Sequence, residues 1–489
     1  MLLAISSHIT EDIAPVPLLW VLPLALYLLT FIVCFEWPRV YVRGVWAGLF
    51  IGSMAFAAWQ VGKPNPKLLE LVGGQLLILT SCCMICHGEL YGRRPDPKRL
   101  TSYYLAIAAG GALGGAFVSL AAPVLFNTRL EYDLILHVSA VLLLVCVVLD
   151  SKSALRLHNR WAVAWLLFIA AWVVVISLNL VSWVSRYALS VENMRNFYGT
   201  MTLTLDNRQD PPNMYFRMLH GRITHGGQFA NPKYRKWPST YFSLQSGIGR
   251  LLTAPSDHPR RVAVMGLGVG TLAAYGRPGD TFRFYEINPQ MTRVAVESFT
   301  SLDDSDATVE VIPGDGRLSM ERELERGQPQ NYDVIILDAF SGDSVPVHLL
   351  TKEAFEMYLK HLAPGGVIAV NISNRYLNLT RVMAGLAREF NLHARVLVNP
   401  PDILKLVMAS KWVLLSRDKT VLDQAQLRDG AMVIDPKTDP ILWTDEFASL
   451  VPLVEWSSRP PPPPAPSPTT VPTQPAASEP ASAPATAPF

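Results

Sequence analysis

Long apolar runs occupy the first 185 residues of the chain, and a shorter-period pattern follows them. The runs lie at 16–35, 45–61, 68–86, 103–126, 134–149 and 161–183. Each is near the ~20 residues that a helix needs to cross a bilayer, and the run at 134–149 is the shortest. We therefore predict a transmembrane domain at 1–185 with about six helices. Residues 1–10 have no basic segment and no small-residue cleavage site, so we expect no cleaved signal peptide.

Beyond residue 185, shorter elements are expected. Residues 196–249 alternate apolar and polar positions between turn signals, which predicts a β-rich lead-in at 196–255. From Arg261 onward strand-like and helix-like stretches alternate, which predicts a doubly wound α/β domain at 256–455. The helices are expected near 288–299, 352–362 and 379–390, and later strands at 367–371, 394–398 and 412–416. Residues 456–489 are almost entirely Pro, Ala, Ser and Thr, which predicts a disordered tail.

Composition narrows the function classes. The chain is 50% hydrophobic and only 17% charged, and its net charge of +2 gives no electrostatic case for nucleic-acid binding. All five cysteines lie in the apolar runs: Cys34, Cys82, Cys83, Cys86 and Cys146. The polar part therefore has no disulfide framework.

The residues that carry chemistry lie between Arg261 and Asn371. An apolar strand at 261–265 runs into the glycine turn Gly266-Leu-Gly-Val-Gly-Thr271, and the next strand ends in Glu286, about twenty residues after the first glycine. That spacing lets a carboxylate bind a ribose. Ligands of open parallel sheets bind beyond the carboxyl ends of the strands. We therefore predict that one nucleoside crevice is lined by Gly266, Gly268, Gly270, Glu286, Asp315 and Asp338.

At these residues the chain resembles the spermidine synthases, which are polyamine aminopropyltransferases, and in particular their membrane-fused bacterial relatives. The resemblance covers about 216–454, and the segments 7–20 and 86–90 resemble the family's membrane half. It implies a Rossmann-like fold of the class I S-adenosyl-methyltransferase type. It also implies transfer of an aminopropyl group from decarboxylated S-adenosylmethionine, as co-substrate, to putrescine or a related amine.

The resemblance assigns roles in nucleoside binding to particular residues. Gln228 would contact the nucleoside, and Glu286 would bind the ribose hydroxyls. Asp315 and Gly316 would face the adenine, and Pro346 would line the same site.

The resemblance also assigns roles in acceptor binding. Asp338 matches the family's proton acceptor, Asp343 is the second acid of the same loop, and Tyr241 would contact the acceptor. The chemistry agrees, because a polyamine nitrogen is protonated at neutral pH and must lose a proton before it attacks the carbon beside a sulfonium. A carboxylate can hold the ammonium and take that proton. The mechanism requires no metal and no other cofactor.

Two departures from the family pattern concern the acceptor half of the site. Val269 stands where the family's turn has an Asp that helps to hold the diamine, and the Tyr-His-Glu signature is replaced by the segment 239–245. An S-adenosylmethionine-dependent methyltransferase, or a non-catalytic polyamine transporter or sensor, therefore remains an alternative. Asp338 could also serve to cap the next helix or to stabilise the loop 339–343.

The apolar half carries two further signals. Cys83-Met-Ile-Cys-His87 matches a haem-attachment pattern, but we favour pairing of His87 and Glu89 with nearby cations such as Arg93. The glycines of 110–115 indicate close helix packing.

These predictions together indicate a cellular location and a set of binding partners. We expect a multi-pass protein of the cell (inner) membrane that contacts lipid and binds a polyamine and an adenosyl sulfonium. If six helices cross the membrane and the loops rich in Lys and Arg face the cytoplasm, the enzyme domain would lie outside the cytoplasm. The adenosyl sulfonium is made in the cytoplasm, however, which places the enzyme domain there. We favour the cytoplasm. Family members are commonly oligomeric, so the resemblance also implies a homo-oligomer.

Overall fold

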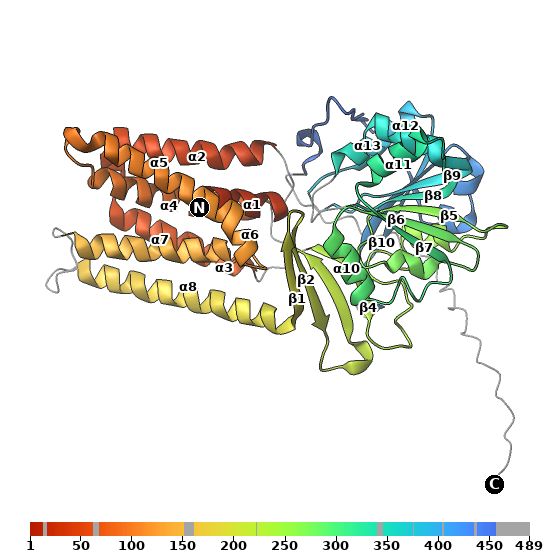
Figure 1. Cartoon of the computed structure of the whole chain (residues 1–489), viewed down its shortest axis with the longest axis horizontal. Helices are drawn as coiled ribbons and strands as arrows, with labels where there is room; N and C mark the ends of the chain where they lie inside the picture. Colours follow the sequence, from red (N-terminus) through yellow and green to blue (C-terminus); the bar gives the residue numbers. More distant parts are fainter. Residues whose placement is uncertain are drawn as a thin grey trace, which may run out of the picture. The chain divides into compact units, whose positions relative to one another are not determined.

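The computed structural model describes residues 1–12, 17–61, 68–150, 161–221, 223–339, 346–374, 376–402, 405–434 and 438–455. The first part of the chain is helical, and the later part combines a small antiparallel sheet with a large mixed sheet flanked by helices (Figure 1). Two predictions fall outside the described residues. These are Asp343 with its loop and the tail at 456–489.

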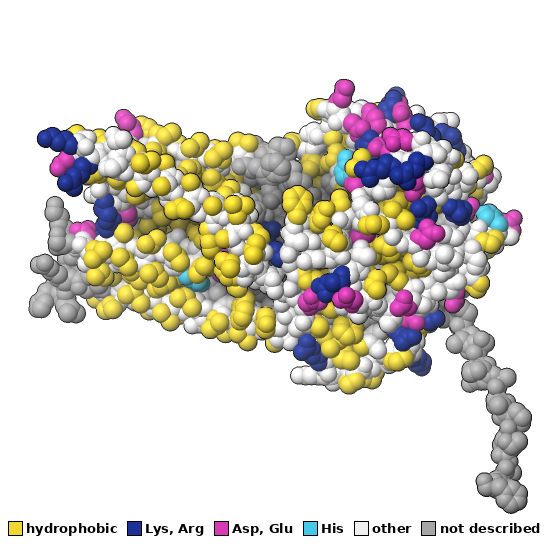
Figure 2. All heavy atoms as spheres, viewed as in Figure 1, with side chains coloured by type: hydrophobic (Ala, Val, Ile, Leu, Met, Phe, Trp, Pro, Cys, Tyr) yellow, Lys and Arg dark blue, Asp and Glu magenta, His cyan; other side chains and the backbone are white. Residues whose placement is uncertain are grey.

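The described residues of the six predicted apolar runs fall in helices, except Phe126 at the end of the fourth run. The helices are α1 (Leu2–Asp12), α2 (Pro17–Glu36), α3 (Arg43–Val61), α4 (Leu68–Gly92), α5 (Leu100–Ala116), α6 (Ala122–Leu125), α7 (Leu130–Leu149) and α8 (Trp161–Leu189). A π-helical turn, Phe117–Ala121, joins α5 to α6. Four stretches of the described chain are long and apolar enough to cross a membrane, namely Leu69–Gly92, Pro97–Leu125, Leu130–Leu149 and Trp165–Leu189. Hydrophobic side chains cover much of the visible face of these helices (Figure 2).

Helix α4 is the inner helix of this bundle. Its apolar window is 61% buried, against 11% for the windows in Pro97–Leu125 and Trp165–Leu189. Buried Glu89 accepts from Tyr41 Oη at 2.8 Å, from Arg43 Nε at 2.6 Å and from Arg93 Nη1. The predicted pairing of Glu89 with Arg93 is therefore confirmed. His87 instead shares a hydrogen bond with Thr30 on α2, at 3.2 Å from its Nδ1.

A four-stranded antiparallel sheet follows α8. It comprises β1 (Ser190–Asn196), β2 (Gly199–Asp206), β3 (Tyr215–His220) and β4 (Ile223–Phe229), in that order. The predicted β-rich lead-in is thus present, and its first strand begins six residues earlier than expected, at Ser190 rather than 196. The side chains of β1 do not alternate clearly between buried and exposed positions, because Met194 is its one fully buried residue.

The large sheet has the order β12-β10-β11-β9-β8-β5-β6-β7. Its strands are β5 (Arg261–Met265), β6 (Thr281–Glu286), β7 (Thr308–Pro313), β8 (Tyr332–Leu337), β9 (Leu362–Asn371), β10 (His393–Asn399), β11 (Ser410–Ser416) and β12 (Met432–Val433). Strands β5 to β9 are parallel, whereas β10, β11 and β12 pair in antiparallel fashion. The sheet is therefore doubly wound, as predicted, with an antiparallel edge. Strand β5 lies between β6 and β8, which makes its end the switch point of the chain order.

Helices cover both faces of this sheet. They are α9 (Gly247–Leu252), α10 (Pro289–Glu297), α11 (Gly316–Glu325), α12 (Lys352–His361), α13 (Thr380–Glu389), α14 (Lys419–Leu422) and α15 (Ala425–Arg428). Alternate residues of β5 enter different cores: Ala263 packs with α12 and α13, and Val264 packs with α9. Strands covered on both faces are apolar at almost every position, which is why β5 and β8 could be predicted from sequence.

Candidate functional site

The ends of β5 and β8 touch through their backbones. The Asp338 N–H, just after β8, donates to the Met265 carbonyl at the end of β5, at 3.1 Å. A Cβ placed on Gly266 would lie 2.7 Å from the Asp338 carbonyl oxygen, and the φ of Gly266 is +91°. Glycine is therefore required at this position, both for its backbone angle and for this close approach.

Glu286 lies under the glycine turn. It ends β6, is 8% exposed, and accepts hydrogen bonds from the Leu267 N–H at 2.9 Å and the Asn288 N–H at 2.7 Å, one on each oxygen. Burial raises the pKa of this carboxyl, although the backbone N–H donors oppose the rise. Each oxygen has further acceptor capacity, so the carboxylate is oriented and can still accept from a pair of hydroxyls.

Asp315 has partners that the sequence did not predict. It caps α11 by accepting from the Leu318 N–H at 2.9 Å, and its Oδ2 lies 2.9 Å from His348 Nε2. Burial acts to raise the pKa of Asp315, but the hydrogen bonds from His348 and the backbone outweigh it and hold the pKa below its usual range. Pro346 directly precedes the 3₁₀ turn Val347–Leu349 that carries His348. A Cβ on Gly316 would lie 2.1 Å from Met265 Sδ, so this glycine allows close packing on β5.

Asp338 has the proton affinity that a base at neutral pH needs. Burial raises the pKa of its carboxyl to about 7, although a hydrogen bond from Asn371 Nδ2, at 2.6 Å, opposes the rise. Burial and the nearby charge of Asp338 together raise the pKa of Tyr241 well above its usual range. Within the described residues no backbone N–H donates to the Asp338 carboxylate.

Gln228 forms its side-chain hydrogen bonds with a segment other than these acids. Its Nε2 donates to Thr300 Oγ1 at 2.9 Å and to Ser301 Oγ at 3.2 Å, and its Oε1 accepts from the Thr300 N–H at 3.0 Å. Thr300 and Ser301 follow the C-terminal end of α10 in the chain. In this structure Gln228 thus ties β4 to that segment.

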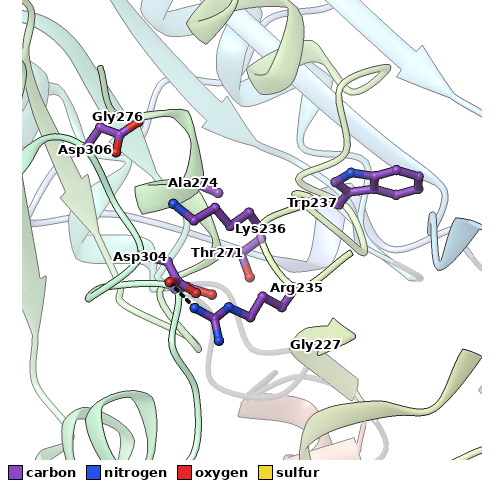
Figure 3. A pocket seen from close by; sticks show the side chains of 10 residues that line it. Gly227, Arg235, Lys236, Trp237, Thr271, Ala274, Gly276, Asp304 and Asp306 are labelled. Carbon is purple, nitrogen blue, oxygen red and sulfur yellow. Dashed lines mark hydrogen bonds and ion pairs between the residues drawn. The ribbon is translucent and has the colours of Figure 1, made fainter. Parts of the chain in front are cut away.

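A small hollow lies beside Gln228 (Figure 3). It is lined by Gly227, Arg235, Lys236, Trp237, Thr271, Ala274, Gly276, Ser301, Asp304 and Asp306. Arg235 points toward Asp304 and pairs with it at 2.7 Å. No predicted site acid lines this hollow, so the candidate site is defined by the strand ends.

Similarity to known proteins was sought over the whole sequence. No protein-family model matches the sequence. The chain is 32% identical over 127 residues to a probable polyamine aminopropyl transferase of Bifidobacterium longum, which is 25% of this chain and 26% of that protein. It is 28% identical over 166 residues to a polyamine aminopropyltransferase of Vibrio vulnificus, covering 33% of this chain and 46% of that protein. Part of the α/β domain is therefore similar to polyamine aminopropyltransferases.

Other relatives are more distant in function or in structure. An N-terminal histidine N-methyltransferase of Emericella nidulans is 32% identical over 183 residues, covering 34% of this chain and 31% of that protein. The chain thus spans less than half the length of these curated relatives. A spermidine synthase structure from Thermotoga maritima has 13% identity and a TM-score of 0.33, and covers 54% of this chain and 84% of its own. Human methyltransferase-like protein 13 has 25% identity and a TM-score of 0.27, and covers 36% of this chain and 78% of its own.

One departure from the aminopropyltransferase pattern has a structural explanation. Val269, in the place of the family's Asp, is fully buried in a cluster formed by Met194, Met201, Leu203, Met218, Met291, Val294 and Phe299. The cluster joins the small sheet to α10. The side chain at this position therefore contributes to packing in this chain.

Sequence reasoning missed two residues of the site, Asn371 and His348. Asn371 is a polar residue at the end of a buried strand, and that position was a signal that could have been used. His348 gave no comparable signal, because its contact with Asp315 depends on how the chain returns after β8.

Proposed function

We propose that this chain is a membrane-bound aminopropyltransferase that uses decarboxylated S-adenosylmethionine and acts on putrescine or a related amine. The observation that carries the proposal is Asp338, a carboxyl with a pKa of about 7 beside the glycine turn at the switch point. Similarity to polyamine aminopropyltransferases supports the reaction type. The acceptor and the membrane location are part of the proposal.

In the proposed reaction Glu286 holds the ribose hydroxyls and the glycine turn lets the nucleoside approach β5. The ammonium of the acceptor gives one proton to Asp338, and its nitrogen lone pair attacks the carbon beside the sulfonium. The carbon–sulfur bond breaks and its electrons go to sulfur, which leaves neutral methylthioadenosine and a secondary ammonium. Transfer of a proton to a positioned base of matched pKa typically contributes ~10²- to 10⁴-fold in rate.

The helices α1 to α8 would hold the enzyme in the cell membrane as part of a domain at 1–185. The apolar face of the bundle and its four stretches of spanning length support this location. We place the lead-in at 196–255 and the catalytic domain at 256–455 in the cytoplasm, where the donor is made. Accessibility of an added C-terminal tag to protease in sealed inverted vesicles tests this placement.

The test of the reaction is product analysis by mass spectrometry. The detergent-purified chain is offered decarboxylated S-adenosylmethionine with a panel of diamines and polyamines. We expect an aminopropylated amine and methylthioadenosine in equal amounts, at least 100-fold less of both from Asp338→Asn, and wild-type amounts from Asp306→Asn. Asp306 is a matched control because it is exposed at the separate hollow. Equal turnover by Asp338→Asn would refute the role of this base.

A methyltransferase is the second candidate, because a histidine N-methyltransferase is among the relatives at 32% identity. The same assay with intact S-adenosylmethionine distinguishes the two reactions. A methylated product together with S-adenosylhomocysteine would replace the aminopropyl proposal. Binding of both donors without any product would favour a polyamine sensor or transporter.

A further inference from the structure

Asn371 holds the carboxylate of Asp338 from the neighbouring strand. It ends β9, is 4% exposed, and donates from Nδ2 to Oδ1 of Asp338 at 2.6 Å. In the part of the chain that the structure describes, Asn371 is the hydrogen-bond partner of that carboxylate, and no described residue bonds Oδ2. The two oxygens of Asp338 are therefore not equivalent.

The orientation of the Asn371 amide is fixed from its other side. The Ser373 N–H donates to Oδ1 of Asn371 at 2.9 Å. Because a backbone N–H can only donate, the amide oxygen must face Ser373 and the amide nitrogen must face Asp338. Ser373 is itself attached to β11, since the Lys411 N–H donates to its hydroxyl at 2.8 Å.

We propose that Asn371 is a positioning residue that fixes Oδ1 of Asp338 and leaves Oδ2 to receive the proton of the attacking amine. This inference rests on the function proposed above. A carboxylate held by one oxygen has a restricted rotation, so its free oxygen faces a fixed direction. Fixed orientation of a base relative to its substrate is a large part of its effect on rate.

Asn371 also acts on the proton affinity of Asp338. Its donated hydrogen bond stabilises the ionised carboxylate and opposes the effect of burial. Among the described titratable groups, Tyr241 interacts with Asp338 electrostatically from the segment before α9. Glu286, at the end of β6, is bonded to the Leu267 and Asn288 N–H groups. Loss of the Asn371 amide should therefore raise the pKa of Asp338 further.

The test compares Asn371→Ala and Asn371→Gln with Asn399→Ala. Asn399 is a matched control, because it also ends a strand, is 2% exposed, and donates to the Met408 carbonyl at 2.9 Å rather than to Asp338. For Asn371→Ala we expect kcat to fall ~10- to 100-fold with an unchanged KM for the donor. The acid limb of its kcat profile should move to higher pH. Asn371→Gln should partly restore kcat and the position of the acid limb. Asn399→Ala should leave kcat and the acid limb as in the wild type.

A second measurement separates this inference from the proposed function. Difference infrared spectroscopy, with Asp338→Asn as the reference, follows protonation of the Asp338 carboxyl without any turnover. If the wild type forms no aminopropylated product, the proposed function fails, while a higher carboxyl pKa in Asn371→Ala still supports control of this proton by Asn371. An unmoved carboxyl titration, or kcat and acid limb equal to those of the wild type, would overturn the inference.

Discussion

The side chain of Val269 lies directly against Gly226, so that a Cβ on Gly226 would be 2.5 Å from Val269 Cγ2. The φ of Gly226 is +128°, an angle that side chains rarely allow. This contact joins β4 of the small sheet to the glycine turn. The glycine turn is therefore packed against apolar side chains at the position where the aminopropyltransferase pattern has a carboxylate.

We predict that Val269→Asp destabilises the chain rather than improving its affinity for diamines. The new carboxylate would lie in a cluster of apolar side chains. Burial of an unpaired charge costs several kcal/mol or forces its protonation. Thermal unfolding of the detergent-solubilised protein should show a lower Tm, with Val269→Ala, which only creates a cavity, as the milder control. A stable variant with a lower KM for diamines would contradict this prediction.

The second prediction concerns pH and activity. Asp338 must be ionised to take a proton, and burial raises its pKa to about 7. We therefore expect kcat/KM to increase about tenfold per pH unit below pH 7 and to level off above it. Initial rates between pH 5 and 9 with saturating donor measure this limb. A midpoint near 4, the usual value for an Asp, would show that the raised pKa is not that of the catalytic base.

The same carboxyl should make stability depend on pH. Its pKa is ~3.9 in the unfolded chain and about 7 in the folded one, so the folded state holds the proton more tightly. The contribution to stability is therefore full below pH 4, is lost as the pH rises through 7, and is absent above it. Asp338→Asn should gain stability relative to the wild type over this window, as measured by Tm at pH 5 and pH 8. A difference in Tm that is the same at both values would contradict this prediction.

A fourth prediction concerns nucleoside binding by Glu286. In Glu286→Gln the amide group cannot accept both the Leu267 and Asn288 N–H bonds and also accept from two ribose hydroxyls. We expect affinity for methylthioadenosine to fall ~10- to 100-fold, because removal of a charged acceptor costs ~1.5–3 kcal/mol. Isothermal titration calorimetry measures this change. Glu297→Gln is the control, since that side chain is 60% exposed on α10, and equal losses in both variants would remove the role from Glu286.

The fifth prediction concerns the helical part. Glu89→Ala would leave Tyr41 and Arg43 without the carboxylate that both contact. Breaking a buried ion pair on one side typically costs ~3–5 kcal/mol. We expect a clear loss of Tm and of purified yield. Glu36→Ala, at the exposed end of α2, should change neither, and equal stability of the two variants would show that the Glu89 cluster is not structural.

The local pattern of apolar and polar residues was sufficient to predict the main helices and strands of the α/β domain. Strands β5 and β8 are continuous apolar runs because both faces are buried, and α10, α12 and α13 were confirmed within two residues at most of their ends. The start of β1 was missed because the residues at 190–196 are mostly polar. Its place is set by pairing with β2 rather than by burial.

Contacts between distant segments account for what the sequence did not predict. Gln228 bonds Thr300, which is 72 residues away, and Asp338 bonds Asn371, which is 33 residues away. Neither of these contacts produces a recognisable motif or residue spacing in the sequence. The strand ends could be inferred to share one edge, but the partners of each carboxylate depend on how loops return to that edge.

The central position of α4 has a consequence for biogenesis. Its buried polar side chains include Ser81, His87 and Glu89, which would be costly in lipid alone. Their partners Ser53, Thr30 and Arg43 lie on helices made before α4. In the proposed membrane location, α2 and α3 would thus already offer hydrogen-bond partners when α4 is synthesised. The polar side chains of α4 could then enter the bilayer in contact with protein rather than with lipid alone.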